Sequence, residues 1–269
     1  MSGTNERHEP VDESGLDVAR VMRNKSRRSF LVMGISAAAG LAGWQWLTTR
    51  TKVGAVPYPL RRALEFNETL SESYFDSARL APTFPREMAR EPRVNGGEGL
   101  PDAFDPLAWQ LQVVGAGKPL TFTLEDIQRL PRVEMITELK CIEGWSVIVN
   151  WAGSRLSDFM AEHSLGTRNR TRLDVRNRQR DLVRYVGLET PDRAYYVGLD
   201  MQSALHPQTL LCYEMNGQPL PVEHGGPLRL VTTVKYGIKS IKRIGRITFT
   251  DDRPPDFWAE RGYDWYAGH

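Results

Sequence analysis

Short runs of alternating apolar and polar residues, separated by glycine, proline or asparagine, dominate the chain between residues 109 and 250. This alternation predicts β-strands, because successive side chains of a strand point to opposite faces of its sheet. The predicted strands cover residues 109–114, 119–122, 133–140, 147–151, 183–188, 210–215, 228–234 and 244–250. Helical patterns between them are short. We therefore expect an α+β fold with mixed β-sheets and short helices.

Two of the short helices have recognisable starting points. Thr123 is expected to be an N-cap, because Glu125 and Asp126 follow it in the first helical turn. A second helix is expected over residues 156–163, with Ser154 or Ser157 as its cap.

The N-terminal segment predicts export. Arg27-Arg28 is followed by Phe30 and by an uncharged run to residue 47 that is rich in alanine and glycine, which fits a twin-arginine signal. A membrane anchor is the alternative, because the run is about as long as a minimal membrane span and ends without a clear A-x-A cleavage site. The twin-arginine route moves folded proteins that commonly carry a cofactor. We therefore expect a periplasmic or other extracytoplasmic protein loaded with a bulky cofactor.

Composition divides the chain into four parts. Residues 1–52 hold the signal or possible anchor, and residues 53–105 are expected to form an extended arm with a short helix near residues 62–72. Residues 106–250 contain the predicted strands, and residues 251–269 are expected to be a tail packed on that domain. About 215 residues follow the first part, enough for one domain with a sizeable core.

The two cysteines occupy different kinds of position. Cys212 lies inside the apolar run of residues 210–215, which predicts a buried structural thiol. Cys141 lies where the strand of residues 133–140 gives way to a loop, so its sulfur can be offered to a bound group. The sequence has no C-x-x-C-H motif and no paired C-x-x-C motifs, and its five histidines are scattered. A metal cage made by the protein alone is therefore not expected.

Charge excludes one class of function and marks one unusual segment. A formal net charge of +2 with 25% charged residues does not predict nucleic-acid binding. Between residues 168 and 184, however, arginines recur with a period of two. They are Arg168, Arg170, Arg172, Arg176, Arg178, Arg180 and Arg184. This pattern fits a solvated strand pair or insertion, or a docking surface for an acidic redox partner or an anionic membrane.

Several blocks of sequence resemble, in combination, the sulfite-oxidase-fold molybdopterin enzymes, and above all their exported branch, which includes catalytic subunits of periplasmic methionine-sulfoxide reductases. The resemblance covers roughly residues 65–265. The blocks are Cys141-Ile142-Glu143-Gly144-Trp145-Ser146, Leu205-His206-Pro207, the stretch from Tyr213 to Pro221, the stretch from His224 to Leu230, the stretch from Lys235 to Lys242, and the stretch from Phe257 to Tyr263.

The resemblance implies a sulfite-oxidase-type molybdopterin-binding domain and a set of site residues. In this family one protein thiolate, here Cys141, binds molybdenum together with the dithiolene sulfurs of one molybdopterin (Mo-MPT), and a soft sulfur ligand suits such a centre. Tyr195 and Tyr196 precede Gly198 at a place where sulfite oxidases keep an active-site tyrosine. Tyr196 could hydrogen-bond an oxo ligand or the substrate, and a core or rim aromatic is an equal interpretation. The implied cofactor contacts are Asn67, Thr190, His224, Arg229, Ser240, Ile241 and Lys242.

The implied activity is two-electron oxygen-atom transfer on a small or protein-bound substrate, with electrons exchanged with a separate membrane b-type or soluble c-type cytochrome. Sulfite oxidases typically place arginines after their cysteine, whereas Glu143 stands there in this chain. Because a carboxylate repels sulfite, a neutral sulfoxide-like substrate ranks above sulfite oxidation or dehydrogenation. Two further alternatives remain open. One is a cofactor-free thiol enzyme in which His206 or His224 activates Cys141, and the other is an exported binding domain without catalysis.

Overall fold

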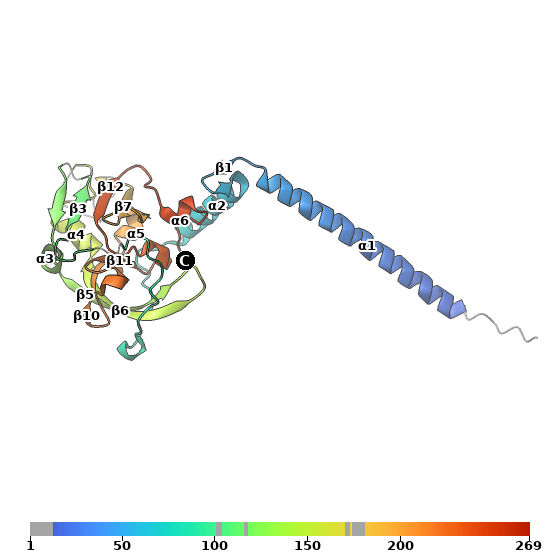
Figure 1. Ribbon diagram of the computed structural model, residues 1–269, viewed down its shortest axis with the longest axis horizontal. Coiled ribbons are helices and arrows are strands. Elements are labelled where there is room, and N and C mark those ends of the chain that lie inside the picture. The colour runs from blue at the N-terminus through green and yellow to red at the C-terminus, as the bar shows by residue number, and fades with distance from the viewer. Residues whose placement is uncertain (1–12, 101–103, 116–117, 170–172, 174–180) are drawn as a thin grey trace, which may run out of the picture. The chain divides into compact units, whose positions relative to one another are not determined.

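The computed structural model describes residues 13–100, 104–115, 118–169, 173 and 181–269 (Figure 1). The chain divides into two units, of which the first comprises residues 1–52 and 57–59 and the second comprises residues 53–56 and 60–269. The first unit contains helix α1 (Glu13–Thr48), of which Lys25–Thr48 is long and apolar enough to cross a membrane, with a mean hydropathy of 1.4. The short strands β1 (Lys52–Val53) and β2 (Val56–Pro57) follow it in sequence.

Two five-stranded sheets form the body of the second unit. In the first sheet the strand order is β10-β9-β6-β5, and β11 also pairs with β9. In the second the order is β4-β3-β12-β7-β8. The strands are β3 (Leu111–Val114), β4 (Leu120–Phe122), β5 (Arg132–Lys140), β6 (Ser146–Arg155), β7 (Tyr185–Glu189), β8 (Tyr196–Asp200), β9 (Thr209–Met215), β10 (Gln218–Pro219), β11 (Arg229–Thr232) and β12 (Arg246–Thr250).

The prediction of an α+β fold with mixed sheets and short helices is confirmed. The pairing of β3 with β12 is parallel and the other pairings of these two sheets are antiparallel, so the second sheet is mixed. The helices of the second unit are mostly single turns or two turns. Within the described residues they are α2 (Tyr58–Tyr74), α3 (Leu124–Gln128), α4 (Leu156–Glu162), α5 (Met201–Ala204) and α6 (Phe257–Glu260), with 3-10 turns η1 (Arg86–Met88), η3 (Val222–His224) and η4 (Gly237–Lys239).

The predicted helix starts had different outcomes. Thr123 does cap α3, in a capping box in which it exchanges hydrogen bonds with Asp126. The prediction that Ser154 or Ser157 caps α4 was wrong, because the N-cap is Arg155 and makes no side-chain cap bond. The Ser154 hydroxyl instead donates to the Ile127 carbonyl at 3.0 Å.

Strand β9 is buried on both faces and joins two apolar clusters. Leu211 and Tyr213 pack into the larger cluster, which also contains residues of the second sheet, whereas Leu210 and Cys212 pack into a smaller cluster with β5 and β6. Cys212 has no exposed surface, and burial raises the pKa of its thiol to about 12. The prediction of a buried structural thiol is confirmed.

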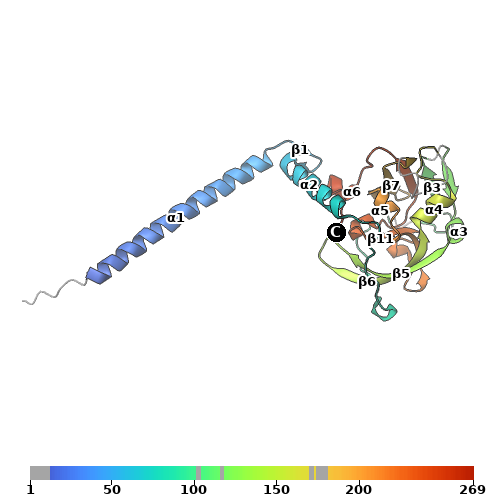
Figure 2. The same ribbon diagram turned by 180° about the vertical axis from the view of Figure 1, so that it is seen from behind.

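The long hairpin of β5 and β6, visible in Figure 2, delivers the chain to the loop that contains Cys141. Strand β6 continues beyond the predicted residue 151 because a bulge between Ala152 and Gly153 lets it pair with β9. A Cβ atom at Gly153 would lie 2.1 Å from the Leu211 carbonyl oxygen, so glycine is required there.

Helix α2 is longer than the short helix predicted near residues 62–72. It packs on the C-terminal segment of the second unit, where Arg61 donates to the Ala259 carbonyl at 2.8 Å and Arg253 pairs with Glu68. Most of the arginine-rich stretch, from Arg170 to Arg180, lies outside the described residues. At its two ends, Arg168 and Arg184 both bond to Asp251.

Candidate functional site

A pocket of about 330 Å³ opens beside Cys141 and is built by segments far apart in the sequence. The arm, the β5–β6 loop, the turn around η3, the loop between β11 and β12, and the C-terminal segment all contribute. The lining residues are Pro92, Arg93, Asn95, Gly96, Glu98, Leu139, Cys141, Ile142, Glu143, Trp145, Tyr195, His224, Arg229, Gly237, Ile238, Ser240, Lys242, Trp258 and Tyr263.

Cys141 is held at the pocket wall by a tight turn. Its N–H donates to the Trp145 carbonyl at 2.9 Å, and the N–H of Gly144 donates to the Cys141 carbonyl at 3.2 Å. Gly144 has a φ of +85°, a conformation that favours glycine. Burial, with a smaller contribution from the Glu143 charge, raises the pKa of the Cys141 thiol. The protein alone therefore disfavours the thiolate, whereas a bound metal cation would stabilise it.

The neighbour of the Cys141 sulfur is an amide group. Asn95 Nδ2 lies 3.7 Å from Sγ and 3.3 Å from Glu143 Oε2. The same Glu143 oxygen accepts a hydrogen bond from the Trp145 indole at 2.9 Å. His206, by contrast, does not line the pocket, and its ring bonds to the Arg79 carbonyl. His206 is therefore not placed to activate the Cys141 thiol.

Arg229 places a buried positive charge in the pocket wall. Its side chain donates to the carbonyl oxygens of His224 and Ser240, each at 3.0 Å, and its guanidinium lies 4.9 Å from the Trp151 ring centroid. Burial lowers the pKa of Arg229 to about 10, so the group remains a cation at neutral pH.

Lys242 brings a second cation to the same wall. Its ammonium donates to the carbonyl oxygens of Asn95 and Glu223, each at 3.1 Å. Burial, followed by the Arg229 charge, lowers the pKa of Lys242 to about 8. Two cations in one partly desolvated wall repel each other, and an anionic ligand would relieve that cost.

Two polar atoms of the pocket residues are buried without a partner among the described residues. They are His224 Nδ1 and Ser240 Oγ. His224 is fully buried, and its other ring nitrogen lies 3.1 Å from Glu91 Oε1. Since buried polar atoms are normally hydrogen-bonded, these two atoms have bonding capacity that the described residues do not use. These groups together fit a ligand that has three parts. The Cys141 sulfur suits a metal, the unpaired atoms suit a polar ring, and the two cations Arg229 and Lys242 suit a phosphate.

The pocket brings together Cys141, His224, Arg229, Ser240 and Lys242 among the predicted site residues. Asn67 is not among them, because it is exposed on α2. The asparagine that does reach Cys141 is Asn95, and its only sequence signal is a polar residue before Gly96-Gly97 in the arm.

Ile241 and Thr190 lie behind the pocket wall rather than in it. Ile241 belongs to the larger apolar cluster. Thr190 is buried, and its hydroxyl accepts a hydrogen bond from the Tyr195 N–H at 3.2 Å. Thr190 therefore orients Tyr195, which lines the pocket.

The structure places Tyr195, not Tyr196, at the pocket. The Tyr195 hydroxyl donates to the Ile238 carbonyl at 2.6 Å, whereas the Tyr196 hydroxyl donates to Glu260, away from the lining residues. The expectation that Tyr196 contacts an oxo ligand or the substrate is not supported by this geometry. Both rings pack against the Phe257 ring, at centroid distances of 5.0 Å and 5.9 Å, but only Tyr195 lines the pocket.

This difference predicts unequal effects of two matched variants. Tyr196→Phe is expected to leave turnover within about twofold of the wild type, because an exposed surface contact contributes little. Tyr195→Phe removes the hydrogen bond from the Tyr195 hydroxyl to the Ile238 carbonyl. It is expected to lower the free energy of unfolding by about 1 kcal/mol. Steady-state kinetics and urea denaturation of both variants measure these effects. A loss of turnover confined to Tyr196→Phe would restore the catalytic role first predicted for Tyr196.

The lowered pKa of Lys242 predicts a pH dependence of anion binding. The ammonium form is lost as the pH rises through about 8, so the affinity of cofactor-free protein for inorganic phosphate should fall about tenfold between pH 7 and pH 9. Titration calorimetry measures this affinity. Lys242→Met should bind more weakly at pH 7 and show a flatter profile, whereas the exposed Lys118→Met should keep the wild-type profile. A wild-type affinity that does not change with pH would contradict the assignment.

The lowered lysine pKa values have the opposite effect on the stability of the folded protein, which rises with pH. Lys242 and Lys235 both have pKa values of about 8 in the folded protein, below the ordinary lysine value of 10.5. Between about pH 8 and pH 10.5 the unfolded chain therefore binds more protons. These two groups consequently make the cofactor-free protein more stable as the pH rises through that window.

Comparison with known proteins shows the family of the chain. Residues 98–258 match the family described as "Oxidoreductase molybdopterin binding domain". The chain is 31% identical to the putative protein-methionine-sulfoxide reductase subunit YedZ1 of Azospira oryzae, over 94% of this chain and 91% of that protein. It is 36% and 35% identical to the protein-methionine-sulfoxide reductase catalytic subunits MsrP of Ralstonia nicotianae and Campylobacter jejuni, over 60% and 61% of this chain.

The matched region spans only 50% and 57% of those two catalytic subunits. Among solved structures, the sulfane dehydrogenase SoxCD from Paracoccus pantotrophus aligns with a TM-score of 0.48 and 21% identity, over 66% of this chain and 46% of that one.

The family match identifies an oxidoreductase. The chain belongs to the family of oxidoreductases that have a molybdopterin-binding domain, so the predictions of the family and of an enzyme are confirmed.

Proposed function

We propose that the protein is an exported mononuclear molybdenum oxidoreductase that reduces a sulfoxide-type substrate. The observation that carries this proposal is the position of Cys141 in one pocket with Arg229, Lys242 and the residues His224 and Ser240, each of which has an unpaired polar atom. A Mo-MPT cofactor bound there would supply the two-electron redox chemistry. The residues of the chain bind it, orient it and restrict access to it.

Each group has a proposed task. Cys141 supplies one thiolate to the metal. Arg229 and Lys242 hold the phosphate, for which a guanidinium and an ammonium are suitable donors. His224 and Ser240 offer their unpaired atoms to the polar parts of the cofactor. Asn95, which donates toward the Cys141 sulfur, is added to the predicted set.

Glu143 and the apolar groups of the pocket support a neutral substrate. Glu143 carries a carboxylate at the pocket, which would repel sulfite. Ile142, Trp145, Trp258 and Tyr263 provide apolar and aromatic surface around it, suitable for a thioether side chain. Three relatives bear names that refer to protein-methionine-sulfoxide reductases. A methionine sulfoxide, free or within a protein, is therefore the proposed substrate.

Export and electron supply complete the proposal. Residues 1–52 are proposed as a twin-arginine signal or retained anchor, residues 53–105 as the arm, residues 106–250 as the cofactor domain and residues 251–269 as a tail packed on it. The apolar helix Lys25–Thr48 supports the first assignment. A separate cytochrome, b-type in the membrane or c-type in solution, is the proposed electron donor.

The test uses the full chain purified from a host that makes molybdopterin. Metal analysis should find about one molybdenum per chain, and acid release should yield an oxidised pterin. With a reduced dye as electron donor, the protein should reduce a methionine-sulfoxide peptide and should oxidise sulfite poorly. A protein that lacks both molybdenum and pterin would refute the proposal, and efficient sulfite oxidation would favour the sulfite dehydrogenase alternative.

A further inference from the structure

The loop between β11 and β12 faces the pocket on one side and the protein core on the other. Gly237, Ile238, Ser240 and Lys242 line the pocket on one side. Lys239, between them in sequence, does not line the pocket and is fully buried on the opposite side. This arrangement anchors the pocket residues from behind.

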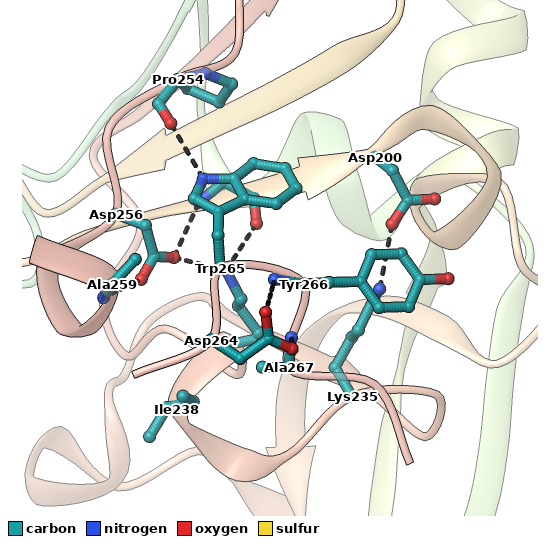
Figure 3. Close-up of polar contacts among 12 residues, drawn as sticks. Asp200, Lys235, Ile238, Pro254, Asp256, Ala259, Asp264, Trp265, Tyr266 and Ala267 are labelled. Atoms are coloured by element: carbon teal, nitrogen blue, oxygen red, sulfur yellow. Dashed lines mark hydrogen bonds and ion pairs between the residues drawn. The ribbon is translucent and has the colours of Figure 1, made fainter. Parts of the chain in front are cut away.

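Lys239 is anchored by a buried ion pair. Its ammonium lies 2.5 Å from Asp256 Oδ2, donates to the Gly198 carbonyl at 3.0 Å and lies 4.7 Å from the centroid of the Trp265 ring. Both side chains of the ion pair are 1% exposed. Figure 3 shows Asp256 and Trp265 together in this cluster.

Asp256 connects the ion pair to another wall of the pocket. Its other carboxylate oxygen accepts a hydrogen bond from the Ala259 N–H at 3.0 Å and so caps helix α6 (Figure 3). Trp258, the second residue of that helix, lines the pocket, as does Tyr263 beyond it. One ion pair therefore joins the loop that carries Ser240 and Lys242 to the segment that carries Trp258.

A second buried pair in the same loop provides an internal comparison. Lys235 lies 3.0 Å from Asp200 Oδ2, and its ammonium lies over the Tyr266 ring. Asp200 caps α5, which contributes no residue to the pocket lining. Lys235 is as deeply buried as Lys239, with a side chain that is 1% exposed, but its partner lies outside the pocket walls.

We propose that Lys239 and Asp256 form a positioning pair. The pair fixes the distance between the loop that carries Ser240 and Lys242 and the segment that carries Trp258, and thereby determines how firmly the cofactor is retained. The effect on cofactor retention rests on the proposed function, whereas the coupling of the two pocket walls does not.

The charge of the pair can be separated from the helix cap. Asp256→Asn keeps an amide oxygen that can cap α6 and removes the charge, and Lys239→Met removes the ammonium and keeps most of the side-chain volume. Each single variant leaves one charge buried without its partner, which is destabilising, whereas the double variant leaves none. Lys235→Met is the matched control for the loss of a buried lysine from the same loop.

The first measurement is amide hydrogen exchange of the full chain, which does not require cofactor. Asp256→Asn and Lys239→Met are expected to accelerate exchange in residues 237–242 and in residues 257–263 together. Lys235→Met should not accelerate exchange in residues 257–260. Unchanged exchange in both segments in the Lys239 and Asp256 variants would overturn the proposal, whether or not the wild type carries molybdenum.

The second measurement is the rate of loss of molybdenum and pterin from the loaded protein, together with its Tm. The single variants should lose cofactor about tenfold faster than Lys235→Met, as expected for residues that orient a ligand site. The double variant should recover Tm and still lose cofactor faster than the wild type. Cofactor loss that simply follows Tm across all four variants would show a structural role alone. A wild type without cofactor would refute the proposed function and leave the exchange measurement to decide this inference.

Discussion

Cys141→Ser is expected to remove almost all molybdenum from the purified protein and to lower sulfoxide reduction at least a hundredfold. A serine hydroxyl is a hard oxygen donor that stays protonated near neutral pH, so it replaces a soft thiolate ligand poorly. The change is nearly isosteric, so the turn held by Gly144 and Trp145 should persist. Metal analysis, pterin release and kinetics measure the three effects separately.

Cys212→Ala is the matched control for this variant. Cys212 is fully buried in the smaller apolar cluster and does not line the pocket. Its removal should reduce the free energy of unfolding by about 1 to 2 kcal/mol, by creating a small cavity, and should leave the molybdenum content unchanged. Equal molybdenum in Cys141→Ser and the wild type would show that Cys141 is not the metal ligand.

Arg229→Met is expected to have the second large effect, on both stability and cofactor content. The variant leaves the buried carbonyl oxygens of His224 and Ser240 without their donors, at a cost of about 3 kcal/mol in the free energy of unfolding. It also removes the buried cation that is proposed to hold the phosphate. Urea denaturation of cofactor-free protein isolates the first effect, and pterin content after purification reports the second.

Arg246→Met is a suitable control, because Arg246 makes a surface hydrogen bond to Gln112 and does not line the pocket. It should change the free energy of unfolding by less than about 0.5 kcal/mol. If Arg229→Met kept its full pterin content, the phosphate would have to bind elsewhere in the pocket.

The sequence predicted those parts of the site that depend on local pattern and family resemblance. Cys141 could be placed because the strand before it alternates clearly, and Arg229 and Lys242 because they lie in recognisable blocks. Ser240 and Lys242 reach the pocket, whereas Ile241 between them packs into the core.

The predicted residues differ from the residues that line the pocket where the face of an element depends on distant partners. Strand β8 is short and contains Gly198, so its pattern did not show whether Tyr195 or Tyr196 faces the pocket. Asn67 and Asn95 both lie in the arm, and only its path across the domain brings Asn95 to Cys141. The Lys239–Asp256 pair likewise joins residues whose partnership is set by tertiary packing.

The parallel pairing of β3 with β12 has a consequence for the order of folding. It aligns Gln112 with Arg246, so the second sheet cannot be completed until strands from the two ends of the domain have met. Pairings over such long sequence distances form slowly, because the entropy of closing the intervening loop is lost before the contacts compensate for it. We therefore expect no stable half-domain on the way to the native state, and folding should proceed as one slow cooperative event.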